Sequence, residues 1–210
     1  MADVKICGVT DPDAIAAALA GGARYVGFVF FPKSPRHLSL ERAASLAGAV
    51  NGRAETVAVT VDADPDLLAA LRKTVAPDWI QLHGRETPAH IRAARAFAAK
   101  GVIRAVPIAR RTDLAGIAPL ADAADMLLFD AKAPEGVALP GGNGAAFDWT
   151  ILNGFQSPKP WLLSGGLTPG NVAEAIATAA APGVDVSSGV ERAPGVKDTK
   201  LITAFLAAAR

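Results

Sequence analysis

Two side chains of this sequence could form an acid/base pair, and each stands at the end of a short apolar segment. Cys7, the only cysteine, ends the segment at residues 4–7, and Asp130 directly follows the apolar residues 126–129. A thiolate accepts a proton and a carboxylic acid donates one, so the pair suits general acid/base catalysis. The alternatives are that Cys7 is a small buried apolar residue and that Asp130 pairs with Lys132.

Two runs of small residues could bind a phosphate group. They are Gly165-Gly166 and Ser187-Ser188-Gly189, and each follows an apolar segment late in the chain. Small residues let backbone N–H groups approach an anion closely, and such groups bind phosphate without a lysine. The alternative is that these glycines only form tight turns.

Basic side chains offer a third kind of chemistry. Arg36 ends the proline-braced segment 31–36, and its guanidinium could hold a carboxylate with two hydrogen bonds. The alternative is a solvated loop charge. His37 and His83 could bind a metal, but no third ligand stands at a metal-site spacing, so we predict no metal site.

The elements that must position these groups alternate along the chain. Short apolar segments rich in β-branched residues predict buried strands at residues 4–7, 25–30, 57–61, 79–82, 102–107, 126–129, 160–163 and 184–186. Stretches rich in Ala and Leu predict helices over residues 11–20, 39–46, 64–73, 87–100, 112–120, 148–152, from 168 onward, and 197–208. Four of these helices begin with an Asp–Pro or Thr–Pro pair, which is a helix start signal.

Strands that alternate with helices predict a parallel sheet with helical crossovers. Eight such units favour a single-domain α/β fold, the (β/α)8 TIM barrel, over residues 1–210; an open doubly wound sheet is the alternative. In a barrel, the loops that follow the strands share one face, where Cys7, Asp130 and both small-residue runs would meet. The segment 131–146, rich in Pro and Gly, is long for such a loop and is interpreted as a substrate lid.

The composition excludes several classes of function. The 21 basic and 20 acidic side chains are spread along the chain and leave a formal net charge of +1, so we expect neither a nucleic-acid nor a membrane partner. The N-terminus lacks the apolar core of a secretory signal, and no apolar run could span a bilayer. With a single cysteine, a reducing compartment, the cytoplasm, is expected. The oligomeric state, monomer or homodimer, stays open.

The chain resembles the phosphoribosylanthranilate isomerase family from end to end. Seven motifs in the same order carry the resemblance: VKICGVT, FVFFPKSPRHL, QLHG, LLFDAK, GGNGAAFDW, LLSGGLTPGNV and VDVSSGVERAPGVKD. The resemblance implies an Amadori rearrangement of N-(5-phosphoribosyl)anthranilate to the corresponding 1-deoxyribulose phosphate in tryptophan biosynthesis. It implies neither a cofactor nor a metal.

The same resemblance implies a role for each site residue. Cys7 would be the general base that removes the proton from the sugar carbon next to the anomeric carbon, and Asp130 the general acid that protonates the ring oxygen. Arg36 would hold the anthranilate carboxylate, and Asp185 would lie near the sugar hydroxyls. The residues implied in phosphate binding are Gly142, Gly144, Gly166, Ser188 and Gly189.

Two other functions stay open at this point. A phosphoribosyl isomerase of histidine biosynthesis resembles a barrel with two phosphate sites and two catalytic aspartates, and Cys7 speaks against it. A barrel that binds a phosphorylated ligand without catalysis, as a sensor, would need neither Cys7 nor Asp130.

Overall fold

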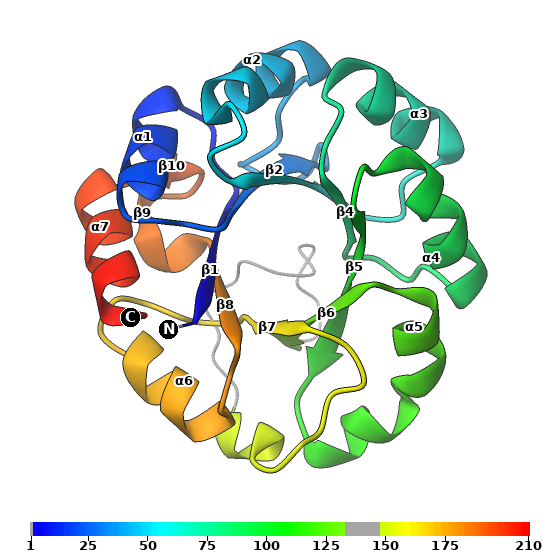
Figure 1. Ribbon diagram of the computed structural model, residues 1–210, viewed down its shortest axis with the longest axis vertical. Coiled ribbons are helices and arrows are strands. Elements are labelled where there is room, and N and C mark those ends of the chain that lie inside the picture. The colour runs from blue at the N-terminus through cyan, green and yellow to red at the C-terminus, as the bar shows by residue number, and fades with distance from the viewer. Residues whose placement is uncertain (1, 133–147) are drawn as a thin grey trace.

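Eight parallel strands close into a barrel in the computed structural model, which describes residues 2–132 and 148–210 (Figure 1). The strands are β1 (Asp3–Cys7), β2 (Tyr25–Phe30), β3 (Glu55–Thr60), β4 (Trp79–Leu82), β5 (Gly101–Ile108), β6 (Met126–Ala131), β7 (Trp161–Leu163) and β8 (Gly183–Val186). β1 pairs in parallel with both β2 and β8, which closes the ring. The predicted (β/α)8 barrel is therefore confirmed, and the open sheet is excluded.

Helices surround the barrel on the outside (Figure 1). They are α1 (Pro12–Ala20), α2 (Leu40–Val50), α3 (Pro65–Thr74), α4 (Pro88–Ala94), α5 (Ala118–Ala123), α6 (Val172–Ala179) and α7 (Thr199–Ala208). The first four begin as predicted, because an Asp, Ser or Thr side chain accepts a backbone N–H of the first turn in each. The capping side chains are those of Asp11, Ser39, Asp64 and Thr87.

The later helices differ from their predicted bounds. The helix predicted over 87–100 ends at Ala94 and continues only as the 3-10 turn η1 (Arg95–Phe97). The prediction over 112–120 covers two short elements, η2 (Arg111–Gly116) and α5, and that over 148–152 is the 3-10 turn η3 (Trp149–Leu152). These segments are too short to add many i to i−4 hydrogen bonds, so the tighter 3-10 turn is preferred.

The last two helices also start later than predicted. Residues 168–171 form a turn in which the Asn171 side chain accepts from Thr168 N and donates to Gly166 O, so α6 begins only at Val172. Asp198 caps α7 through the N–H groups of Lys200 and Leu201, which moves that start from 197 to Thr199.

The buried apolar side chains form two clusters, one inside the barrel and one between the strands and the surrounding helices. The interior cluster includes Cys7, Tyr25, Val57 and Leu128, whereas the strand residues between them pack outward against the helices. Because side chains alternate along a strand, Lys5 and Cys7 of β1 both face the barrel interior. The interior thus holds polar groups near the ends of the strands.

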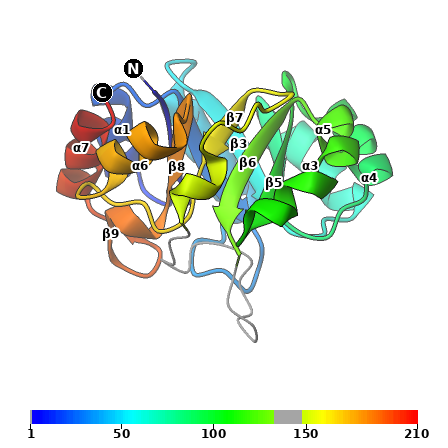
Figure 2. The same ribbon diagram turned by 90° about the horizontal axis from the view of Figure 1, so that it is seen from below.

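A small antiparallel hairpin that the sequence analysis did not predict follows β8. The 3-10 turn η4 (Ser188–Val190) leads into β9 (Glu191–Ala193), which pairs with β10 (Val196–Lys197). Seen from the side, β9 lies at the end of the barrel toward which β6 points, whereas both termini lie at the other end (Figure 2). The hairpin therefore adds side chains to the face where the strands end.

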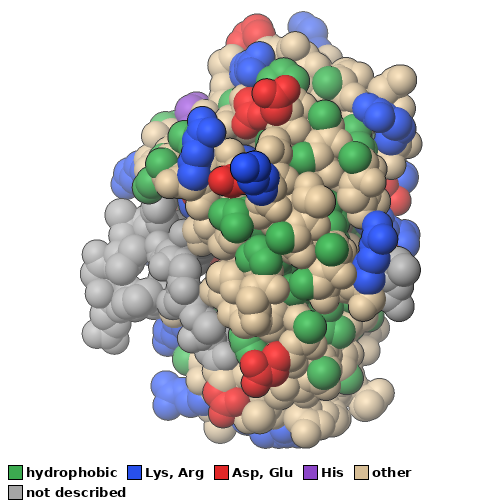
Figure 3. Space-filling model, turned by 90° about the vertical axis from the view of Figure 1, so that its left-hand side faces the viewer, with side chains coloured by type: hydrophobic (Ala, Val, Ile, Leu, Met, Phe, Trp, Pro, Cys, Tyr) green, Lys and Arg blue, Asp and Glu red, His purple; other side chains and the backbone are tan. Residues whose placement is uncertain are grey.

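The outer surface is mixed in character. On the flank seen in Figure 3, basic and acidic side chains are interspersed among apolar ones. Within residues 2–132 and 148–210, no helix is long and apolar enough to cross a membrane.

Candidate active site

Cys7 lies at the C-terminal end of β1 and is 7 % exposed. Burial raises the pKa of its thiol above the ordinary value, and the negative charge of Asp185 adds to this effect. The positive charges of Lys5 and Lys197 oppose it. Two opposing effects therefore act on Cys7: its burial favours the neutral thiol, and the nearby cations favour the thiolate.

Asp130 lies near the end of β6 and is 5 % exposed. Its Oδ1 accepts a hydrogen bond from Ala131 N at 2.9 Å, and its Oδ2 lies 3.2 Å from Nε2 of His83. Over the part of the chain that the structure describes, His83 and not Lys132 forms the ion-pair contact with this carboxylate. The imidazole of His83 thus lies within ion-pair distance of the carboxylate of the candidate acid.

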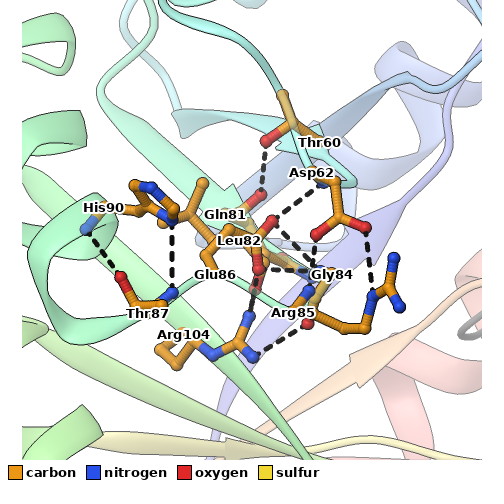
Figure 4. Close-up of polar contacts among 10 residues, drawn as sticks. All are labelled: Thr60, Asp62, Gln81, Leu82, Gly84, Arg85, Glu86, Thr87, His90 and Arg104. Carbon is orange, nitrogen blue, oxygen red and sulfur yellow. Dashed lines mark hydrogen bonds and ion pairs between the residues drawn. The ribbon is translucent and has the colours of Figure 1, made fainter.

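The loop that carries His83 is held by a buried carboxylate (Figure 4). Glu86 accepts hydrogen bonds from Gly84 N at 2.9 Å and from Asp62 N at 3.0 Å, and it pairs with Arg104 of β5. Arg104 also donates to Gly84 O at 2.9 Å. Because both Glu86 and Arg104 are buried, this network fixes the loops after β3 and β4 to the wall of the barrel.

Arg36 is buried rather than solvated, so the loop-charge alternative does not hold. Its Nε and Nη2 donate to the two carboxylate oxygens of Glu191 at 2.7 and 2.8 Å. Lys197 donates to the same carboxylate at 2.8 Å. Burial raises the pKa of Glu191, but the hydrogen bond from Arg36 and the charge of Lys197 outweigh it, so this pKa lies below its ordinary value. The β9–β10 hairpin thus orients Arg36 beside Gly8, the residue after Cys7.

The two small-residue loops lie against each other. A side chain at Gly189 would begin only 1.8 Å from the backbone oxygen of Leu167, so these backbones approach as closely as glycine allows. Gly166 adopts a positive φ of 63°, and Ser188 begins the turn η4. The predicted members Gly166, Ser188 and Gly189 are therefore brought together at the ends of β7 and β8.

Asp185 is buried within β8, directly opposite Lys5 of β1 in the strand register. Its Oδ1 lies 2.7 Å from Lys5 Nζ, and its Oδ2 accepts a hydrogen bond from Ser164 at 3.2 Å. Both of its oxygens thus have partners within the protein.

Two predicted residues, Gly142 and Gly144, fall outside the described residues, as does most of the segment 131–146. Across residues 2–132 and 148–210 the structure contains no group of three His, Cys, Asp or Glu side chains that could hold a metal ion.

Four further side chains belong to this face and were not assigned a role from the sequence: Lys5, His83, Glu191 and Lys197. Lys5 carried a usable signal, because a charged residue two positions before Cys7 in an apolar strand must face the same way. His83 directly follows the fourth predicted strand, residues 79–82, which also places it at this face. Glu191 and Lys197 had no such signal, since the hairpin that carries them shows no strand periodicity.

A closed parallel barrel with titratable side chains gathered where its strands end has the architecture of a TIM-barrel enzyme. A sequence profile of the N-(5'-phosphoribosyl)anthranilate (PRA) isomerase family matches residues 4–208. The chain belongs to that family.

Individual relatives agree with this assignment. The chain is 55 % identical over 208 residues to N-(5'-phosphoribosyl)anthranilate isomerase of Rhodopseudomonas palustris, covering 99 % of this chain and 95 % of the relative. It is 52 % identical over 206 residues to the enzyme of the same name from Brucella canis, with 98 % and 93 % covered. The crystal structure of phosphoribosyl anthranilate isomerase from Thermotoga maritima is 34 % identical, with a TM-score of 0.89 and 100 % and 98 % of the two chains covered.

Proposed function

We propose that this protein converts N-(5'-phosphoribosyl)anthranilate to 1-(2-carboxyphenylamino)-1-deoxyribulose 5-phosphate, an aldose–ketose isomerisation of tryptophan biosynthesis. One observation carries the mechanism: Cys7 and Asp130 stand at the ends of two separate strands, β1 and β6, on the same face of the barrel. A substrate between them would have an acid on one side and a base on the other.

Asp130 is the general acid in this proposal. It donates a proton to the furanose ring oxygen, and the ring opens to an iminium ion. The cationic iminium acidifies the neighbouring C–H bond, and the thiolate of Cys7 removes that proton. The resulting neutral enolamine then gains a proton at the former anomeric carbon and loses the proton of its enol hydroxyl, which gives the ketone product. The reaction is a rearrangement of protons and therefore needs no external oxidant or cofactor.

The remaining predicted residues bind the substrate. Arg36, oriented by Glu191, holds the anthranilate carboxylate through the edge of the guanidinium that Glu191 does not occupy. Gly166, Ser188 and Gly189 bind the phosphate through backbone N–H groups, with Gly142 and Gly144 contributing from the segment outside the described residues. A structure 32 % identical to this chain, with a TM-score of 0.86, was solved with reduced 1-(o-carboxyphenylamino)-1-deoxyribulose 5-phosphate, which supports a phosphorylated substrate.

Residues 1–210 form one domain in this proposal, acting in the cytoplasm as a monomer or homodimer. One similar structure from Thermotoga maritima, 33 % identical with a TM-score of 0.83, is described as a dimeric isomerase made monomeric. Sedimentation of the purified protein would distinguish the two states.

The decay of anthranilate fluorescence with freshly prepared substrate tests the proposed function. Wild type should consume the substrate rapidly, whereas Cys7→Ala and Asp130→Ala should each lose at least about a thousandfold in kcat. Folded wild type without turnover would reject the function, and a Cys7→Ala variant of near-normal rate would reject the assigned base.

A further inference from the structure

Lys5 is a fully buried charged side chain that the proposed mechanism does not use. It is 0 % exposed, and it lies two residues before Cys7 on β1, so both side chains face the barrel interior. A buried ammonium is unfavourable unless it is paired, and Asp185 Oδ1 accepts its hydrogen bond at 2.7 Å. Burial lowers the pKa of Lys5, but the charges of Asp185 and Cys7 outweigh it, so this pKa lies above its ordinary value. The paired Asp185 carboxylate therefore favours the charged form of Lys5 inside the barrel.

The position opposite Cys7 shows how close this cation lies to the thiol. In the register of β1 and β2, Cys7 faces Gly27. A side chain at Gly27 would begin 3.2 Å from Cys7 Sγ and 3.3 Å from Lys5 Nζ. The sulfur and the ammonium thus both border the space that the glycine leaves open, and a β-carbon at this position would make tight contacts with both.

We propose that Lys5 is a positioning residue that favours the thiolate form of Cys7, with Gly27 keeping the space that brings the two groups together. The inference rests on the proposed function, in which Cys7 acts as a base. A base in an apolar pocket needs a nearby positive charge to lose its proton, because burial alone favours the neutral thiol. The Asp185 carboxylate holds the Lys5 ammonium in place through the hydrogen bond between them.

Other charges surround Cys7 and enter the same balance. They come from the strand β8, the loop after β2 and the β9–β10 hairpin, and they are those of Asp185, Arg36, Glu191 and Lys197. The Glu191 carboxylate contacts both Arg36 and Lys197, which offsets much of their charge. Among these cations, Lys5 is the one whose ammonium borders the same space at Gly27 as the thiol does.

The titration of the thiol tests the inference without any turnover. Because Cys7 is the only cysteine, the rate of alkylation by iodoacetamide as a function of pH reports its thiolate alone, with Cys7→Ala as the blank. In Lys5→Met the midpoint of this titration should rise by about one pH unit or more, and kcat at neutral pH should fall about tenfold or more. The KM should change less than about threefold, since Lys5 does not contact the substrate in this account. Lys5→Arg keeps the charge and should recover most of the wild-type titration.

The same substitution made in the Asp185→Asn variant distinguishes an effect of Lys5 on the thiol from a purely structural role of Lys5. If Lys5 only neutralised Asp185, adding Lys5→Met to Asp185→Asn would leave the thiol titration of Asp185→Asn unchanged. We expect a further upward shift, and its absence would overturn the inference. Should Lys5→Met not fold, Lys5→Gln serves instead, since it removes the charge but keeps a hydrogen-bond donor for Asp185; an unchanged titration would again reject the role of Lys5.

Turnover of wild type decides the proposed function separately. Active wild type with an unchanged thiol titration in Lys5→Met would remove the inference and leave the function intact. A shifted titration in a protein that does not isomerise the substrate would remove the function and retain the effect of Lys5 on the thiol.

Discussion

His83 and Asp130 meet across a strand. His83 follows β4 and Asp130 lies on β6, with β5 between them in the barrel, yet His83 Nε2 and Asp130 Oδ2 are 3.2 Å apart. Side chains from alternate strands of a TIM barrel lie at the same level of the interior, which makes this contact geometrically natural. The residue in contact with the proposed general acid, Asp130, therefore comes from the end of β4 and not from the adjacent strand β5.

Replacing His83 should reduce catalysis more than binding. In His83→Ala the Asp130 carboxylate loses the imidazole that lies 3.2 Å from its Oδ2, so kcat should fall about tenfold to a hundredfold, while KM changes little. Steady-state fluorescence kinetics would measure both constants. A large increase in KM with unchanged kcat would instead assign His83 to substrate binding.

The close approach of the loops after β7 and β8 gives a second prediction. A side chain in Gly189→Ala would collide with the backbone oxygen of Leu167 and push the two loops apart. If these loops bind the phosphate, KM should rise about tenfold, equivalent to about 1.4 kcal/mol, and inhibition by inorganic phosphate should weaken in parallel. Gly170→Ala is the matched control, because its nearest neighbour would be 3.8 Å away, and its KM should stay near the wild-type value.

The pair formed by Glu86 and Arg104 should contribute mainly to stability. Glu86→Leu would leave a buried guanidinium without its carboxylate, and breaking a buried pair in this way costs about 3 to 5 kcal/mol. Urea denaturation monitored by circular dichroism would measure the loss. Glu86→Leu combined with Arg104→Leu should be less destabilised than Glu86→Leu alone, since neither charge remains unpaired. Equal destabilisation of the two variants would show that packing, and not charge, holds the loops.

Glu191 should make stability depend on pH in the acid range. Its pKa is depressed in the folded protein below the ordinary value of 4.5, so its stabilising effect is fully present above that pH and is lost as the pH falls toward the folded value. Wild type should therefore be more stable than Glu191→Gln at neutral pH, with a difference that shrinks below about pH 4.5. Thermal unfolding of both proteins across that range would show it. A difference independent of pH would mean that the Glu191 carboxylate is not specifically stabilised.

Much of the fold could be predicted because the strands carry a strong local signal. All eight predicted strands exist, and the ranges 25–30 and 79–82 agree with β2 and β4. The first four helices, which have side-chain caps, also begin where the sequence predicts. Prediction failed where irregular turns decide the structure. The turn formed by the Asn171 side chain moves the start of α6 to a later residue, and the hairpin of β9 and β10 shows no strand periodicity in the sequence.

In the candidate site, too, some residues could be predicted from local sequence and others could not. Residues at strand ends, such as Cys7, Asp130 and Gly189, could be placed on one face once the barrel was assumed, since all strand ends share that face. Their partners could not be assigned, because the contacts of Asp130 with His83 and of Arg36 with Glu191 join segments 47 and 155 residues apart, and no local pattern encodes such pairing. Their geometry arises only from closure of the ring.

The pairing of the first strand with the last has a consequence for biosynthesis. The Lys5 and Asp185 partners are separated by 180 residues, so on the ribosome the ammonium of β1 is made long before the carboxylate that neutralises it. The incomplete chain cannot bury that charge favourably or close the ring, and contacts of such long sequence separation form slowly. The environment of the proposed base is therefore completed only after β8 has been synthesised, so translation products that end before β8 should lack the activity of the proposed base.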